Sequence, residues 1–246
     1  MAKKSASKVG ADKSIHVHQR EKLKVELSIR ERNDLTVKQI DILKTALDKD
    51  TRCVWIDGLY GSSKTWLSVL ASLKLLNQKK VDQIIYIRNP VESSSTGRMG
   101  YLKGSLEEKL EPYASIVYDK LEELLPQSQI ELLKIENRIE ALPLGFIRGK
   151  SWNCKAIIVD EAASLTWDDF ILLLTRCGEF TRIFLVGDSA NQSDIGNKTG
   201  FRKMFDKFND ETSKANGVHC FELKEKTDIV RSGFVRFVLE HLEIIK

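Results

Sequence analysis

The sequence has few of the features that mark specialised classes of protein. Its four cysteines among 246 residues include no CxxC pair, which favours buried thiols over disulfides or zinc ligands. No apolar run approaches the roughly 18 residues that a membrane-spanning helix needs, and no signal-peptide core follows the start. The net charge of +4 is too small to argue for nucleic-acid binding by itself. We therefore expect a cytoplasmic, globular protein that contacts no membrane.

The most informative stretch is residues 53–76, where an apolar strand, a glycine-bearing turn and a helix follow one another. The turn consists of Gly58, Leu59, Tyr60, Gly61, Ser62, Ser63, Lys64 and Thr65. In this context backbone N–H groups and the helix N-terminus cradle phosphates, while Lys64 reaches the β- and γ-phosphates and Thr65 ligates Mg²⁺. Ser63 stands where a glycine usually precedes the lysine, and its Cβ could crowd the phosphates. The alternative is an ordinary surface turn in which a serine caps the helix.

Two further strands end in polar residues that suit the same site. Residues 155–159 lead into Asp160 and Glu161, which would hold the Mg²⁺ shell and activate a water molecule, respectively; the alternative is a pair of exposed acids that cap a helix. Residues 182–186 lead into a loop with Asp188 and Gln192, where Gln192 could sense the γ-phosphate or the loop could be only a tight turn. Parallel strands carry their ligands at their carboxyl ends, so the three loops are expected to meet.

Apolar periodicity predicts the remaining elements of an α/β fold with a mostly parallel sheet and helices on both faces. We expect further strands at 83–87 and 218–223 and helices that start near residues 36, 106, 128, 201 and 228. Residues 1–28 are expected to form a basic, flexible arm, and residues 29–246 one ATPase domain. The arm, and the loop that follows Arg88, either contact a nucleic-acid backbone or are solvated connections.

Two residues outside these loops are candidates with an alternative each. Gln39 falls on the first turn of the helix that Thr36 caps, where its amide either reads an adenine edge or lies solvated at the surface. Arg231 precedes the last helix, whose expected apolar face includes Phe234, Phe237, Val238 and Leu242. It is either an arginine finger or an ordinary surface arginine.

The order of these motifs resembles the PhoH-like family of P-loop ATPases, over about residues 35–240. The segments between the motifs carry the resemblance as well: residues 88–92, 100–109, 146–152 and 228–231 are similar to family segments. The resemblance implies a three-layer, RecA-like core, ATP and Mg²⁺ as cofactors, hydrolysis, a hexameric ring and a link to RNA. By it, Gln39 matches an adenine contact, Asp160 and Glu161 the acidic pair, Gln192 the sensor and Arg231 the finger. The short chain suggests a minimal, phage-type member that would act in the host cytoplasm.

A single core leaves several functions open. A helicase-like enzyme needs a second surface over the nucleotide, which a neighbouring copy could supply by placing Arg231, or failing that Arg148, on the adjacent site. The leading hypothesis is a ring-forming ATPase that remodels single-stranded RNA or, less readily, DNA. The alternatives are an ATP-gated assembly switch that binds protein partners, a small-molecule kinase, and a relic that Ser63 has disabled.

Overall fold

The computed structural model describes residues 22–88, 106–190 and 195–245. In them six parallel strands form one sheet in the order β3-β2-β4-β5-β1-β6. The strands are β1 (Cys53–Gly58), β2 (Gln83–Arg88), β3 (Ile139–Pro143), β4 (Lys155–Asp160), β5 (Arg182–Gly187) and β6 (Val218–Leu223). Because all strands run the same way, every loop that follows a strand lies at one edge of the sheet. The α/β fold with a parallel sheet is confirmed.

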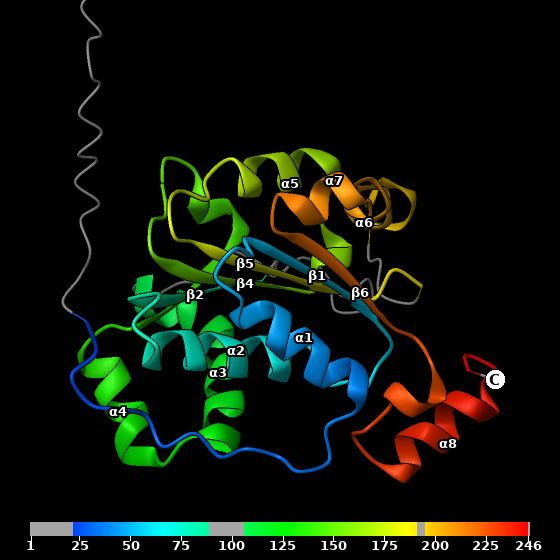
Figure 1. Ribbon diagram of the computed structural model, residues 1–246, viewed down its shortest axis with the longest axis horizontal. Coiled ribbons are helices and arrows are strands. Elements are labelled where there is room, and N and C mark those ends of the chain that lie inside the picture. The colour runs from blue at the N-terminus through cyan, green and yellow to red at the C-terminus, as the bar shows by residue number, and fades with distance from the viewer. Residues whose placement is uncertain (1–21, 89–105, 191–194, 246) are drawn as a thin grey trace, which may run out of the picture.

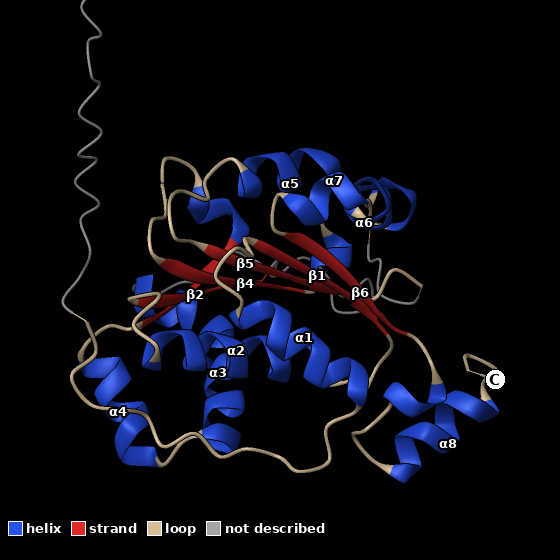
Figure 2. Cartoon of the chain, viewed as in Figure 1, coloured by secondary structure: helices blue, strands red, loops and turns tan. Residues whose placement is uncertain are grey.

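Helices cover both faces of the sheet and make a three-layer molecule (Figures 1 and 2). One face carries α1 (Val37–Leu47), α2 (Lys64–Asn77), α3 (Leu106–Leu124) and α4 (Gln127–Ile135). The other carries α5 (Trp167–Leu174), α6 (Phe201–Phe208) and α7 (Glu211–Ala215). A last helix, α8 (Gly233–His241), lies beyond the end of β6. None of the helices in the described residues is long and apolar enough to cross a membrane.

Alternation along each strand divides the core into two clusters. In β5, Phe184 and Val186 face the layer of α1–α4, whereas Ile183 and Leu185 face α5 and α6. Successive side chains of a strand point to opposite faces, so strands buried on both sides read as continuous apolar runs. This is why the sequence indicates them clearly.

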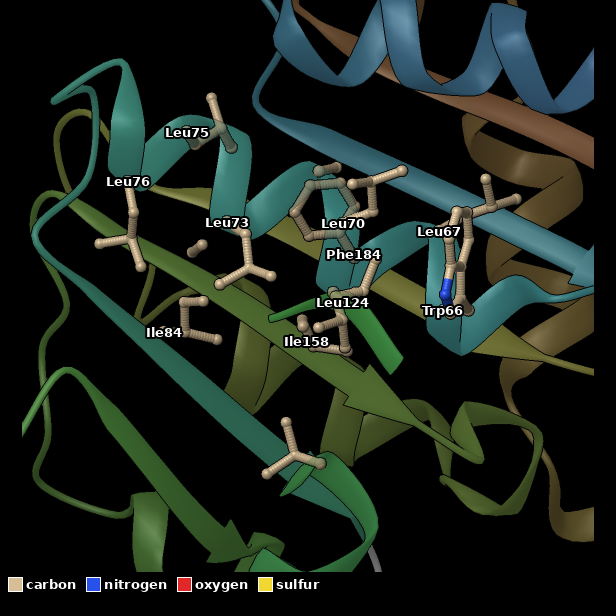
Figure 3. Close-up of a cluster of buried hydrophobic side chains, with 14 of the residues drawn as sticks. Trp66, Leu67, Leu70, Leu73, Leu75, Leu76, Ile84, Leu124, Ile158 and Phe184 are labelled. Carbon is tan, nitrogen blue, oxygen red and sulfur yellow. The ribbon is translucent and has the colours of Figure 1, made fainter. Parts of the chain in front are cut away.

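Helix α2 is the central element of the first cluster, and it begins with Lys64 at the carboxyl edge of the sheet. Its leucines lie on β2, β4 and β5 through contacts with Ile84, Ile158 and Phe184 (Figure 3). Leu73 is fully buried there, and its replacement by alanine would cost about 2–5 kcal/mol. This packing fixes the position of the loop before α2.

The packed chain begins before residue 28, the expected end of the flexible arm. Leu23 and Leu27 are buried in the first cluster. The Leu27 N–H donates to Asn77 Oδ1, and Asn77 Nδ2 donates to the Leu27 carbonyl, both at 2.9 Å. Leu27 therefore attaches this segment to the end of α2, and both leucines pack into the first cluster despite the neighbouring lysines.

The expected apolar face of helix α8 is largely exposed. Of Phe234, Phe237, Val238 and Leu242, Val238 is half-buried, and the other three are 73%, 59% and 61% exposed. The helix is instead attached through Leu239, which packs with Leu59 and Ile229 in a small separate cluster. The phenylalanine spacing indicated an apolar stripe correctly, but it could not show which stripe meets the core.

Candidate active site

A cleft of about 390 Å³ opens at the carboxyl edge of the sheet, where β1, β4 and β5 end. Its lining includes Tyr60, Gly61, Ser63, Lys64, Thr65, Asp160, Glu161 and Arg231, together with Arg32, Trp66, Lys120, Glu123, Val186 and Gly187. The structure thus brings together the glycine-bearing turn, the acidic pair and the late arginine, although Gly58 and Arg231 are 173 positions apart in the sequence.

Loop 58–65 requires glycine at two positions for different reasons. A Cβ on Gly58 would lie 2.8 Å from Leu223 Cβ and 2.9 Å from Ser62 Oγ, so β6 leaves no room for one. Gly61 has a φ of 79°, a conformation that costs little only for glycine. The buried Ser62 closes the turn, since its Oγ donates to the Leu59 carbonyl at 2.8 Å.

Ser63 occupies the left-handed region, with φ 62° and ψ 26°. This explains physically why a glycine suits the position before the lysine, because a side chain there is strained. The alternative of a serine cap is wrong: Ser63 stands at the N-cap of α2, but its side chain makes no capping hydrogen bond.

The Lys64 ammonium lies inside the loop. It donates to the carbonyls of Gly58 and Leu59 at 2.6 and 2.9 Å. Burial lowers the pKa of Lys64 below its usual value, while the negative charges of Asp188 and Asp160 oppose that shift. A cation so placed, desolvated and facing carboxylates, is suited to neutralise a bound phosphate.

The acidic pair is held from two sides. Asp160 Oδ1 accepts from Thr65 Oγ1 at 3.0 Å, and Asp160 Oδ2 accepts from the Tyr86 hydroxyl at 2.6 Å. Burial and the Asp160 charge raise the pKa of Tyr86 well above its usual value, so this hydroxyl stays a donor. Glu161 adopts a φ of 53° and pairs with Arg88 at 3.3 Å. The alternative of two exposed acids capping a helix is wrong for Asp160, which is 7% exposed.

Gln39 is fully buried, so the alternative of a solvated surface residue is wrong. Its Oε1 accepts from the Thr36 N–H, which completes a capping box, and its Nε2 donates to the Ser62 carbonyl at 3.2 Å. Gln39 therefore connects the start of α1 directly to loop 58–65. Its contact with adenine stays a prediction.

Asp57, the residue before Gly58, anchors the loop to the end of β5. Its buried carboxylate accepts from the Ser189 N–H at 2.9 Å and from Ser189 Oγ at 2.6 Å. It also pairs with Lys224 at 2.7 Å and Arg202 at 3.2 Å. Asp188 is fully buried beside it. Gln192, the predicted γ-phosphate sensor, lies outside the described residues.

Arg231 lies at the cleft of its own chain. Its backbone N–H donates to the Gly61 carbonyl at 3.1 Å, and its side chain lines the cleft. Arg148 is exposed and follows the short 3₁₀ turn Leu144–Ile147 after β3, at the opposite border of the sheet from β6. The action of either arginine on a neighbouring copy stays a prediction.

Sequence reasoning missed four residues that shape the site, namely Tyr86, Asp57, Arg32 and Trp66. Tyr86 and Asp57 hold the carboxylate and the loop, as described above. Arg32 stacks over the Trp66 ring, with its guanidinium carbon 5.4 Å from the centroid, at the rim of the cleft. An acid at the end of the otherwise apolar β1 was a usable signal for Asp57. Nothing local in the sequence indicates the other three.

Comparisons with known proteins show which family the chain resembles. A family model described as PhoH-like protein matches residues 31–243. A PhoH-like protein of Mycobacterium tuberculosis is 32% identical over 197 residues, which are 79% of this chain and 53% of that protein. One of Bacillus subtilis is 31% identical over 185 residues (74% and 56%), and one of Synechocystis is 29% identical over 211 residues (85% and 61%). The chain thus spans little more than half the length of the relatives it matches.

Proposed function

Because the chain belongs to the PhoH-like family of P-loop ATPases, we propose that it binds ATP with Mg²⁺ in the cleft and hydrolyses it. The observation that carries the proposal is the contact of Thr65 Oγ1 with Asp160 Oδ1 at 3.0 Å. This hydrogen bond joins a hydroxyl from the start of α2 to a carboxylate from the end of β4, and the charge of that carboxylate acts on the Lys64 ammonium.

The residues present fit both cofactors. Thr65 and Asp160 offer the hard oxygen ligands that Mg²⁺ prefers, and Mg²⁺ takes its remaining ligands from water and phosphates rather than from a protein cage. Among the described residues, no cluster of three or more histidine, cysteine or acidic side chains is suited to a metal. The cleft of about 390 Å³ lies within the range of small-molecule sites, about 300–1,000 Å³.

Each residue has a distinct role in the proposed reaction. Backbone N–H groups of loop 58–65 and Lys64 bind the phosphates, and Lys64 exchanges its contacts with Gly58 and Leu59 for phosphate oxygens. Glu161 orients the attacking water and accepts its proton. Arg88 holds Glu161 in place through their ion pair, and Gln192 senses the γ-phosphate. When bound, Mg²⁺ supplies charge neutralisation on the transferred phosphoryl group.

The decisive experiment measures ATP binding and Mg²⁺-dependent phosphate release for wild type, Lys64→Ala and Glu161→Gln. Lys64→Ala should lose both properties, whereas Glu161→Gln should keep ATP binding and lose turnover by about 10²–10⁴-fold. Glu179→Gln, an exposed acid away from the cleft, serves as the matched control. Retained ATP affinity and hydrolysis in folded Lys64→Ala protein would refute the proposal.

We further propose that copies of this chain assemble head to tail into a ring, hexameric in the family pattern. The exposed Phe234 and Phe237 of α8 and Leu242 just after it make an apolar surface next to the cleft, where Val235 approaches Gly61. Such a surface is typical of a protein contact. A neighbour seated on it would present its β3 border, with Arg148, to the nucleotide. Mixing Lys64→Ala with Arg148→Ala protein should restore partial turnover; no rescue at any ratio would contradict this.

For the role of the turnover, the leading proposal is remodelling of single-stranded RNA or DNA in the cytoplasm. The alternative is an ATP-gated assembly switch that binds protein partners and unwinds nothing. Stimulation of ATP turnover by single-stranded polynucleotide, falling steeply with salt, would support the first. Unchanged turnover with every polynucleotide would favour the switch.

A further inference from the structure

A second pocket, of about 300 Å³, lies at the amino ends of the strands, across the sheet from the cleft. Its polar lining consists of cations: Lys49, Arg52, Lys79, Lys80 and Arg182. Four of them come from the segments that precede β1 and β2, and Arg182 is the first residue of β5. The apolar part of the lining is Val81 and Phe180, and Phe180 is 53% exposed. No acidic side chain is among these lining residues.

Arg182 sets this pocket apart from a group of surface lysines. It is only 5% exposed, and Nη2 donates to the Asp48 carbonyl. Its Nε and Nη1, however, are buried and meet no hydrogen-bond acceptor in the described part of the chain. Burial, with the neighbouring Arg52 charge, lowers the pKa of Arg182 to about 10. Buried donors without partners are rare in native proteins and unfavourable.

The surrounding charges do not neutralise the pocket internally. The acids that influence Arg182 are Asp48 and Asp50, and both are exposed. Lys80 is held by a hydrogen bond of 2.7 Å to the Leu47 carbonyl, which leaves its charge unpaired. Among the described residues, Lys49, Arg52 and Lys79 form no ion pair with a carboxylate. Lys80 and Arg182 are therefore held by carbonyls at the end of α1, and the positive charge of the lining is left in excess around the pocket.

We propose that this pocket binds a phosphate group, which accepts hydrogen bonds from Arg182 Nε and Nη1 and is neutralised by the surrounding lysines and Arg52. An arginine fork matches the geometry of phosphate oxygens, and five cations suit an anion of more than one charge. The exposed Phe180 ring at the rim offers a stacking surface for a base attached to such a phosphate. The phosphate belongs either to a free anion such as pyrophosphate or to the backbone of a single strand. The site is independent of ATP hydrolysis at the cleft.

The test uses the full chain with Lys64→Ala, so that loop 58–65 contributes little to phosphate binding. Calorimetric titration at low salt measures the affinity for pyrophosphate and for a single-stranded oligonucleotide. Adding Arg182→Met should raise the Kd of the bound probe by at least about tenfold, and Lys79→Ala should raise it about two- to fivefold. Arg138→Met, a buried arginine outside the pocket, and Lys203→Ala, an exposed lysine on α6, should leave it unchanged.

The probes separate the two sources of phosphate. Arg182-dependent binding of pyrophosphate identifies a free anion as ligand, and Arg182-dependent binding of the oligonucleotide alone identifies a backbone phosphate. If Arg182→Met does not fold, the exposed pair Lys49→Ala and Lys79→Ala together must weaken binding at least about fivefold. Binding of neither probe, or binding that these substitutions leave unchanged, overturns the proposal.

Discussion

Replacement of Asp57 by asparagine should destabilise the protein more than any other single carboxylate-to-amide change that we describe. Asp57 is fully buried and accepts hydrogen bonds from Ser189, while Lys224 and Arg202 pair with it. The substitution keeps an oxygen for the Ser189 N–H but removes the negative charge. Lys224 and Arg202 then lose the charge of Asp57 and share the exposed Glu222.

The size of the effect follows from the exposure of the cations. Removal of one partner from a fully buried ion pair costs about 3–5 kcal/mol. The side chains of Lys224 and Arg202 are 31% and 43% exposed, so water regains part of their hydration. We therefore expect the free energy of unfolding to fall by about 2 kcal/mol, which is a large share of the about 5–15 kcal/mol typical of a domain.

Urea unfolding at neutral pH measures this change as a lower midpoint with an unchanged slope. Asp206→Asn is the matched control, because Asp206 pairs with the same Arg202 but has a side chain that is 55% exposed. It should cost less than about 0.5 kcal/mol. If Asp57→Asn costs no more than Asp206→Asn, the reasoning from burial is wrong.

The pH dependence gives a second check on the same carboxylate. Burial raises the pKa of Asp57, but the hydrogen bonds from Lys224 and Ser189 outweigh it, so the pKa lies below its usual value. A lowered folded-state pKa contributes stability that is present above the unfolded value of about 3.9 and is lost as pH falls through the folded value. The difference between wild type and Asp57→Asn should therefore be constant from about pH 5 to about pH 8 and shrink below about pH 4.

Three further substitutions test the cleft. Tyr86→Phe removes the donor to Asp160 Oδ2 and should raise the Mg²⁺ concentration needed for half-maximal turnover, at a cost in stability of about 1 kcal/mol; an unchanged Mg²⁺ titration would count against the role of Tyr86. Ser63→Gly removes a side chain from a left-handed backbone conformation. Relief of about 1 kcal/mol of strain is offset by the entropy of glycine, about 0.5–1 kcal/mol, so the urea midpoint should change little. Because the Cβ that could crowd the phosphates is gone, calorimetry should detect tighter ATP binding. Gly58→Ala would place a Cβ 2.8 Å from Leu223 Cβ and should lower the melting temperature and abolish ATP binding, whereas Gly145→Ala, where a Cβ meets nothing within 4 Å, should do neither.

The sequence allowed prediction of most of the sheet and of the loops that end it. Strands buried on both faces are apolar runs, and parallel order brings their carboxyl ends together, so the meeting of Lys64 with Asp160 followed from local patterns alone. Strand β3 was missed because it is an edge strand of five residues with Glu140 inside it and a terminal proline. Helix α5 was missed although Thr166 and Asp169 form a capping box at its start.

The partners of the acidic pair could not be predicted, because they depend on strand register. In the β2–β4 pairing Arg88 lies opposite Asp160 and Tyr86 opposite Ile158, which places both β2 side chains beside acids more than 70 positions away. A shift of one residue would turn Tyr86 to the other face of the sheet. Register is set by the packing of the whole sheet, so no local motif contains it.

The two edges of the sheet differ in charge in a way that the total of +4 conceals. The cleft mixes four cations with three acids, whereas the pocket around Arg182 has five cations and no acid in its lining. A polynucleotide that is attracted by charge alone should therefore bind first at the amino edge, far from the cleft. The affinity for RNA or DNA then does not report whether the polynucleotide stimulates ATP hydrolysis. Arg182→Met separates these two effects. Stimulation of turnover that survives this substitution would come from contacts near the cleft, and stimulation that disappears with it would mean that the sheet couples its two edges.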